Sequence, residues 1–294
     1  MKGRRGFTLV ELVVVIVLVG ILAGAMIMYF KPAIQMYLAS GRRAGLTHQA
    51  DTALRRIVTE VRAAVPNSLR LGGNCLELVP TIAGGRYRIA PDGAWDAVNP
   101  ANPTAALDSA EPVTSFDVLS DFTGKSPGSW AAAKDDWVVI GNQNTADLYA
   151  ATSAVNSTRA QILSVAAAPA GSARITLAAA KQFPVGYDGG RFVIVSNAQQ
   201  AVNYVCTGVG RDSKGTGTGT LYRIAAYGFN ANGVCRTAVS SSPVLATKVA
   251  ACSFLYNPDQ GATQESGYVQ VQPTIADDGE EVTLSYGAHV DNLP

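Results

Sequence analysis

The first thirty residues constrain this chain most, because they form an almost unbroken apolar run behind a short basic leader. The sequence opens MKGRRGFTLVELVVVIVLVGILAGAMIMYF, and Glu11 is the only charged residue between Phe7 and Phe30. At about 1.5 Å per helical residue, this run reaches roughly 36 Å, enough to cross the hydrocarbon core of a bilayer with some tilt. A carboxylate in lipid costs about 2.5–3.5 kcal/mol on insertion scales, so we expect Glu11 to have a partner or a task.

The segment Arg4-Arg5-Gly6-Phe7-Thr8-Leu9-Val10-Glu11 resembles the class III signal of type IV pilins and type II secretion pseudopilins. The resemblance implies that a prepilin peptidase cuts between Gly6 and Phe7 and that the new N-terminal Phe7 is N-methylated. It also implies that Glu11 is the fifth residue of the mature chain. Basic residues, glycine, phenylalanine and glutamate at fixed spacing before a full-length apolar helix make the signal specific.

The same resemblance implies how the chain is divided. It implies a prepilin leader over residues 1–6, a transmembrane or filament-core helix over 7–30, an amphipathic continuation over 31–66 and a β-rich head over 67–294. The expected fold class is α+β and pilin-like, with one long N-terminal helix packed on an antiparallel, β-rich globular head.

The spacing of Phe7 and Glu11 also has a physical rationale. Cleavage after Gly6 leaves a cationic amine at Phe7, and a carboxylate four residues on lies about one helical turn away. In a filament of packed helices, Glu11 instead pairs with the amine of a neighbouring subunit, because an unpaired carboxylate in an apolar core is costly. This hypothesis assigns Glu11 to assembly and fails if Glu11→Leu enters the filament as well as wild type.

Two other interpretations of the N-terminus stay open. One is an ordinary secretory signal peptide cut after Ala23-Gly24-Ala25, although the apolar stretch is long for such a signal and carries a glutamate. The other is a plain signal anchor in which Glu11 has no role. A lipoprotein is excluded because no cysteine lies near the segment.

Bulk composition argues against catalysis and nucleic-acid binding. The formal net charge is +1, so charge gives no reason to expect nucleic acid as a partner. The only histidines are His48 and His289, which makes a histidine-based metal or acid–base site improbable. The sequence shows no nucleophile–base arrangement and no cofactor motif. We therefore predict a protein that is not an enzyme and has no cofactor.

The four cysteines are Cys75, Cys206, Cys235 and Cys252, and none forms a C-x-x-C pair. Residues beyond a signal of this kind face an oxidising periplasm, which favours disulfides. We expect Cys206–Cys235, closing a glycine-rich excursion, and Cys75–Cys252, joining the start of the head to a late strand. Other pairings stay open, since four cysteines allow three.

The region after the apolar run predicts an amphipathic helix that ends near Pro66. Apolar residues recur at helical spacing at Ile34, Tyr37, Leu38, Leu54, Ile57, Val58, Val61 and Val65. Arginines fill other positions, namely Arg42, Arg43, Arg55, Arg56 and Arg62. They indicate either a solvated face or contacts with acidic groups on neighbouring subunits.

The rest of the chain predicts strands and one large loop. Strands are expected at 75–79, 86–89, 116–119, 137–141, 160–165, 174–177, 191–195, 202–206, 221–224, 268–272 and 282–286. Residues 91–112 contain four prolines and many small polar residues, which predicts a loop-like insertion. By resemblance to J-type minor pseudopilins, 202–224 forms a hairpin and 244–256 a small helical turn leading into a strand.

A turn at Asp278-Gly279 is expected to close the last hairpin. The acids around it, Asp277, Asp278, Glu280 and Glu281, present two alternatives. One is a calcium site like that of major pseudopilins, although the spacing is not that of an EF-hand. The other, which we favour, is a solvated turn without a metal.

These observations predict a minor pilin-like subunit that takes part in initiating or capping an MSHA-type type IV pilus. The implied partners are other minor and major pilins, the prepilin peptidase and an inner-membrane assembly platform. The implied location is the bacterial inner membrane as a single-pass protein with its head in the periplasm, and the extracellular pilus after assembly. The alternatives are a J-type minor pseudopilin of a type II secretion system and a membrane-anchored binding module that never polymerises.

Overall fold

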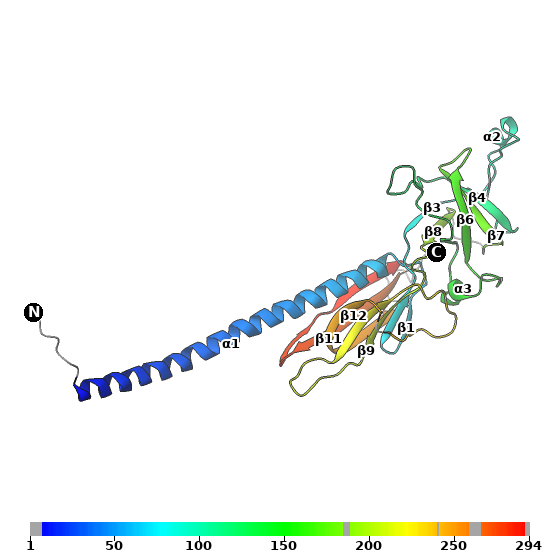
Figure 1. Ribbon diagram of the computed structural model, residues 1–294. Coiled ribbons are helices and arrows are strands. Elements are labelled where there is room, and N and C mark those ends of the chain that lie inside the picture. The colour runs from blue at the N-terminus through cyan, green and yellow to red at the C-terminus, as the bar shows by residue number, and fades with distance from the viewer. Residues whose placement is uncertain (1–7, 185–188, 240, 259–265, 292–294) are drawn as a thin grey trace, which may run out of the picture.

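A computed structural model describes residues 8–184, 189–239, 241–258 and 266–291. Its first element is α1 (Leu9–Arg62), a helix of 54 residues, which spans about 80 Å at 1.5 Å per residue. Pro32 lies inside α1 without ending it. Figure 1 shows the N-terminal half of α1 projecting alone from the head, while its C-terminal half lies along a sheet. The fold is the expected α+β, pilin-like architecture.

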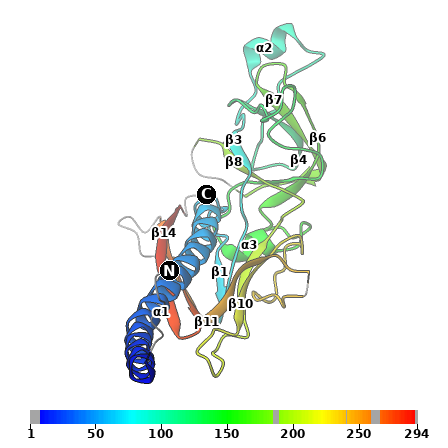
Figure 2. The same ribbon diagram turned by 60° about the vertical axis from the view of Figure 1, so that its left-hand side comes forward.

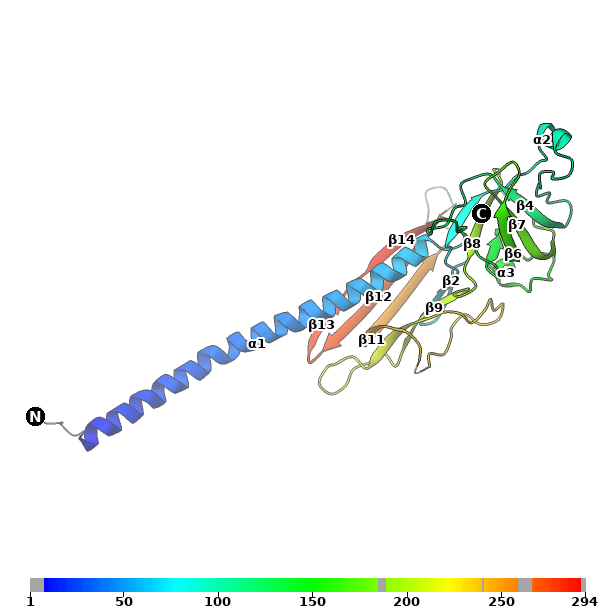
Figure 3. The same ribbon diagram turned by 45° about the horizontal axis from the view of Figure 1, so that its top comes forward.

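The sheet beside α1, here called the proximal sheet, has eight antiparallel strands in the order β1-β2-β9-β10-β11-β12-β13, with β14 also paired to β12. Their bounds are β1 (Arg70–Gly72), β2 (Cys75–Leu78), β9 (Val202–Thr207), β10 (Gly219–Ile224), β11 (Val244–Asn257), β12 (Ser266–Asp277), β13 (Glu280–Thr283) and β14 (Tyr286–Asp291). β13 and β14 follow one another along the same edge of β12. Figure 3 shows α1 lying across this part of the sheet.

The chain between β2 and β9 forms a second, six-stranded sheet in the order β3-β8-β5-β6-β7-β4. Its elements are β3 (Ala83–Arg86), α2 (Gly93–Val98), β4 (Val113–Val118), β5 (Trp137–Val139), α3 (Thr145–Tyr149), β6 (Arg159–Ala167), β7 (Ala173–Lys181) and β8 (Arg191–Val195). The edge strands meet, because Arg88 N–H donates to the Asp117 carbonyl at 2.8 Å and Leu119 N–H to the Arg86 carbonyl at 2.8 Å. We call this nearly closed sheet the distal barrel, and Figure 2 shows α2 at its tip.

Each sheet has its own apolar core. The core under α1 contains Leu46, Ala50, Leu54, Ile57 and Val61 from the helix and inward-facing residues of β2, β9, β10, β11, β12 and β14. The core of the distal barrel includes Phe116, Phe122, Phe192 and Ile162. A smaller cluster joins the two, with Val65, Val79, Val139, Leu148, Tyr149, Val195 and Ala201 buried together. Both cores are therefore formed by side chains that recur at helical spacing on α1 or at every second position on the strands.

The disulfide pairing expected from the sequence is wrong. The structure joins Cys75 to Cys235, with Cα atoms 5.6 Å apart, and Cys206 to Cys252, with Cα atoms 6.4 Å apart. It therefore has neither Cys206–Cys235 nor Cys75–Cys252. Both bonds still lie within the proximal sheet and the loop that covers it.

The reason lies in strand alternation, since successive side chains on a strand point to opposite faces. On β2, Leu76 and Leu78 pack in the core under α1, so Cys75 faces the other side of the sheet. On β9, Tyr204 and Cys206 belong to the core under α1. Cys206 therefore reaches only a cysteine on the helix side, and Cys75 reaches the loop on the outer side.

The structure confirms some of the other expectations and contradicts others. The β9–β10 hairpin is confirmed, and so is the turn before β13, where Asp278 and Gly279 both have positive φ. The small helical turn expected at the start of 244–256 is wrong, because β11 is one strand from Val244 to Asn257. The loop-like insertion at 91–112 contains the helix α2, whose N-cap Asp92 accepts a hydrogen bond from Trp95 N–H at 3.1 Å.

Candidate assembly site

The expected cleavage site lies outside the described residues, because Gly6 and Phe7 are both in 1–7. The first described residue, Thr8, is the N-cap of α1, and its Oγ1 accepts a hydrogen bond from Glu11 N–H at 3.3 Å. Thr8-x-x-Glu11 has the spacing of a capping box, and an acid in the first turn is favoured by the helix dipole. The residues that resemble the signal therefore also start the helix.

Glu11 has no ion-pair partner within 4.0 Å among the residues that the structure describes. Its neighbours on the helix are apolar and exposed, with Leu9, Val10 and Leu12 presenting 79%, 70% and 55% of their surface. A carboxylate in such a setting needs a cation once the surrounding surface is covered. The structure gives Glu11 no cation among the described residues, and its role in assembly stays a prediction.

Every residue of α1 from Leu9 to Leu38 is exposed, although this part of the helix is almost wholly apolar. An 18-residue window within α1 reaches a mean hydropathy of 2.8 with none of it buried, so α1 meets the length and composition of a membrane-spanning helix. Contiguous apolar surface of this extent marks a membrane or protein contact. The described part of the head leaves this surface uncovered.

Head contact begins later along α1 than the sequence pattern indicated. Ile34, Tyr37 and Leu38 are exposed, whereas Leu46 is the first apolar side chain of α1 to be buried. The helix face at Leu54, Ile57 and Val61 is buried as the pattern predicts, and Val58 packs at its margin.

The arginines of α1 mostly pair with acids of the same chain. Arg42 contacts Asp278 in the turn before β13, and Arg43 contacts Glu280, the first residue of β13. Arg55 and Arg56 pair with Asp51 and Glu60, each four residues away on α1. The two remaining acids of the turn are also paired, Asp277 with Lys248 at 2.6 Å and Glu281 with Arg211 at 2.6 Å. The four acids considered for calcium thus bind cationic side chains, and within the described residues no cluster of three metal-ligating side chains occurs.

A buried ionic cluster, which no sequence pattern predicted, fixes the end of α1 to the sheet. Glu60 accepts hydrogen bonds from Arg223 Nε at 3.0 Å and from the Tyr204 hydroxyl at 2.5 Å. Burial and the adjacent Glu60 raise the pKa of Tyr204, so the phenol stays protonated and donates. The available signal was the position of Glu60 on the same helix face as Ile57 and Val61.

A second cluster lies on the outer face of the proximal sheet. Arg70 pairs with Glu77, which also accepts from the Tyr227 hydroxyl at 2.7 Å. Burial raises the pKa of Glu77, although the contacts with Tyr227 and Arg70 act to lower it. Arg70 Nη2 also donates to the Asn230 carbonyl at 2.7 Å. Together with Cys75–Cys235, the cluster holds the chain between β10 and β11 against the sheet.

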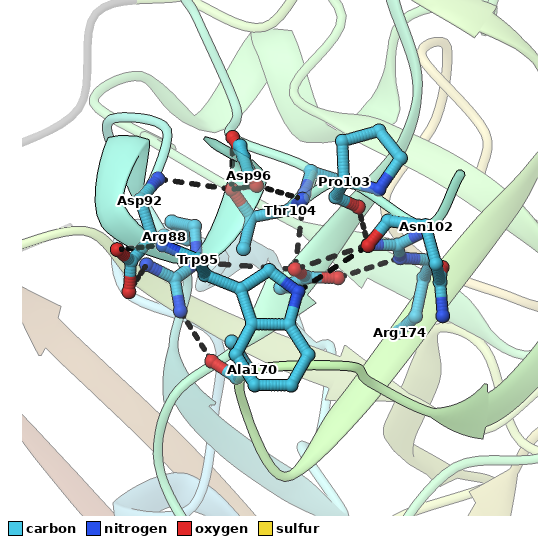
Figure 4. Close-up of polar contacts among 11 residues, drawn as sticks. Arg88, Asp92, Trp95, Asp96, Asn102, Pro103, Thr104, Ala170 and Arg174 are labelled. Carbon is cyan, nitrogen blue, oxygen red and sulfur yellow. Dashed lines mark hydrogen bonds and ion pairs between the residues drawn. The ribbon is translucent and has the colours of Figure 1, made fainter. Parts of the chain in front are cut away.

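The insertion that carries α2 is anchored by polar contacts, which Figure 4 shows around Arg88, Trp95 and Arg174. Arg174 Nε donates to buried Asp117 at 2.6 Å, and Arg174 Nη2 to the Pro103 carbonyl at 2.7 Å. Thr104 N–H donates to Asp96 at 2.8 Å. The range 91–112 is therefore held to the distal barrel by specific contacts.

Residues 1–27 match the family model described as the prokaryotic N-terminal methylation motif. Neither the curated proteins nor the solved structures gave a match to this chain. The chain thus carries the type IV pilin-type methylation motif on a pilin-like α+β architecture. The motif implies processing by a prepilin peptidase, assembly with other pilins and a single membrane-anchoring helix, and its family is structural rather than catalytic.

Proposed function

We propose that this protein is a minor pilin-like subunit that takes part in initiating or capping an MSHA-type type IV pilus. One observation carries the proposal. The methylation motif leads directly into an apolar half-helix that the head leaves bare, from Leu9 to Leu38. Such a helix fits a chain that resides in a membrane and then exchanges lipid for the helices of neighbouring subunits.

In the proposed mechanism, cleavage between Gly6 and Phe7 creates the amine that Glu11 needs. Before assembly the helix spans the inner membrane, with the head in the periplasm. During assembly the carboxylate of Glu11 pairs with the N-methylated amine of an adjacent subunit, and the apolar side chains pack helix against helix. The partners are other minor and major pilins, together with the inner-membrane assembly platform.

A minor role is supported by the distal barrel and by the C-terminal sequence. The barrel adds a second core at the end of the head away from the free half of α1, which gives the subunit a bulky and specific surface (Figure 1). The closing sequence His289-Val-Asp-Asn-Leu-Pro294 resembles the C-terminus of the pilus biogenesis protein MshO. Residues 289–291 end β14, and the remainder lies outside the described residues.

The alternative is a J-type minor pseudopilin of a type II secretion system. The β9–β10 hairpin favours it, because Tyr204 and Arg223, which resemble the J-type hairpin pattern, are paired across the two strands. Deletion of the gene separates the two roles. Loss of surface filaments with normal secretion supports the pilus, and retained protein substrates with normal filaments support the secretion system.

A membrane-anchored binding module that never polymerises is the remaining alternative. Affinity purification of the full chain from cross-linked membranes distinguishes it from both assembly roles. Recovery of other minor pilins with the wild-type chain, and their loss with Glu11→Leu, is the result that the proposal expects. Intact filaments and normal secretion after deletion would contradict it and favour the anchored module.

A further inference from the structure

A pocket of about 290 Å³ opens on the distal barrel where the chain after α3 meets β6 and the end of β7. The side chains that matter for its chemistry are Trp137, Thr152, Ser153, Arg159, Gln161 and Lys181. Ala160 and the alanines at 178–180 supply small apolar walls. The volume is near the lower limit of small-molecule sites, which suits a compact ligand.

Arg159 is a buried cation that has no carboxylate partner among the described residues. Only 5% of its surface is exposed, and it forms no ion pair within the part of the chain that the structure describes. Its Nη1 donates to the carbonyl oxygens of Leu148 and Ala150, while its buried Nε has no hydrogen-bond acceptor among the described residues. Burial lowers its pKa to about 10, so the guanidinium still carries its charge at neutral pH.

The guanidinium is held by aromatic rings instead of by an acid. Its central carbon lies 4.3 Å from the ring centroid of Phe229 and 5.5 Å from that of Trp137. Trp137 is itself fixed, because its Nε1 donates to Asn197 at 3.0 Å. Aromatic faces and carbonyl oxygens attract a cation but carry no full negative charge, so the guanidinium has no counter-ion among the described residues.

Lys181 brings a second positive charge to the same pocket. Its ammonium donates to the carbonyl oxygens of Thr152 and Ala154, each at 3.2 Å, and forms no ion pair among the described residues. Burial, and then the charge of Arg159, lower its pKa. Within the described residues, Arg159 and Lys181 line one cavity without an acid that neutralises them, an arrangement whose charge an anion would balance.

We propose that this pocket binds a small organic carboxylate. Arg159 and Lys181 would supply the charge-assisted hydrogen bonds, because a guanidinium and an ammonium both form short, strong bonds to carboxylate oxygens. The hydroxyls of Thr152 and Ser153 and the amide of Gln161 would orient the polar body, and the alanine walls would limit its size. This binding function goes beyond the proposed role in filament assembly and does not depend on it.

The test is isothermal titration calorimetry on the full chain in detergent, with sodium glucuronate and glucose as matched probes. The two sugars share a six-membered ring and differ in the carboxylate. Lys181→Gln removes one cation, and Lys134→Gln, at an exposed lysine of the same barrel, controls for the loss of charge. Arg159→Lys, which keeps the charge but removes the planar fork, is a second variant.

The proposal expects saturable glucuronate binding by the wild-type chain and Lys134→Gln, and no saturable heat with glucose. Loss of one charged contact is expected to weaken binding about tenfold in Lys181→Gln. Equal binding of glucose, an unchanged affinity in Lys181→Gln, or no saturation with glucuronate would each overturn it. Binding of inorganic phosphate without glucuronate would also overturn it, because the site would then take a free inorganic anion.

Discussion

The two halves of α1 differ in what covers them, although they form one continuous helix. From Leu9 to Leu38 every side chain is exposed, whereas Leu54, Ile57 and Val61 in the second half are completely buried. The second half has its partner in the proximal sheet of the same chain. The first half is more apolar and has no such partner, so its stabilising contacts must come from lipid or from other subunits.

Two glutamates, one in each half of α1, differ in the same way in their ion pairs. Glu60, in the covered half, is paired with Arg56 and Arg223 and accepts a hydrogen bond from Tyr204. Glu11, in the bare half, has no ion pair among the described residues. A buried carboxylate is tolerated only where its charge is matched. The chain matches Glu60 itself, and the proposed function assigns the matching of Glu11 to assembly.

The largest expected effect follows from removing the charge of Glu11. Glu11→Leu and Glu11→Gln should lower incorporation into filaments to background, because the neighbour's amine would lose its counter-ion. Immunoblotting of sheared filaments measures incorporation, and Glu111→Gln, at an exposed acid of the head, is the matched control. Incorporation of both Glu11 variants at the wild-type level would contradict the proposed role of Glu11 in assembly.

Removing the charge of Glu60 should instead destabilise the folded head. Glu60→Gln leaves Arg223 without its buried counter-ion, and breaking such a pair typically costs about 3–5 kcal/mol. Hydrogen exchange of β10 and β11 in increasing denaturant measures the loss. Glu11→Gln should leave the same exchange unchanged, and equal effects of the two variants would contradict the division of α1 into two halves.

Two leucines test the same difference between the halves of α1 for apolar contacts. Leu54→Ala removes a completely buried side chain and should lower the free energy of unfolding by about 2–5 kcal/mol. Leu18→Ala, at a residue with 53% of its surface exposed, should change it by less than about 0.5 kcal/mol. Denaturant titration of both variants in detergent gives the two values, and a large loss in Leu18→Ala would show that the head covers the first half.

The smallest expected effect is on the pH dependence of folding stability, through Asp51 in the half of α1 that the head covers. The hydrogen bond from Arg55, and then that from Tyr286, hold the pKa of Asp51 below its usual 3.8. Its contribution to stability is therefore fully present above the unfolded-state value and is lost as pH falls through the lower folded-state value. The stability difference between wild type and Asp51→Asn should shrink as the pH is lowered below 3.8. A difference that grows instead would show that the sign is wrong.

Much of the architecture follows from local sequence pattern. The apolar run and the spacing of Leu54, Ile57 and Val61 predict α1, because helical periodicity depends only on nearby residues. Alternating runs and the Asp278-Gly279 turn predict many of the strands and the last hairpin. The proposed processing and assembly residues, Gly6, Phe7 and Glu11, are predicted from the residue types and the spacing of the N-terminal motif.

The pairings between distant segments were not predicted from the sequence. The disulfides depend on which face of β2 and β9 each cysteine occupies. The alternation of Leu76 with Cys75 indicates the face of Cys75, but the expected pairing did not take it into account. The distal barrel was missed as a separate sheet, because its order β3-β8-β5-β6-β7-β4 joins strands far apart in the chain. Arg159 gave no signal, since its burial arises only when α3, β6 and the loop at Phe229 come together.

The most direct test of the account is the intact mass and N-terminal peptide of the protein extracted from membranes. We predict a chain that begins with N-methylated Phe7, because assembly through Glu11 requires the amine that cleavage after Gly6 creates. A chain that still begins at Met1, or one that begins at Met26, would contradict it. Either result would leave Glu11 without its proposed partner and would favour an anchored or secreted binding module.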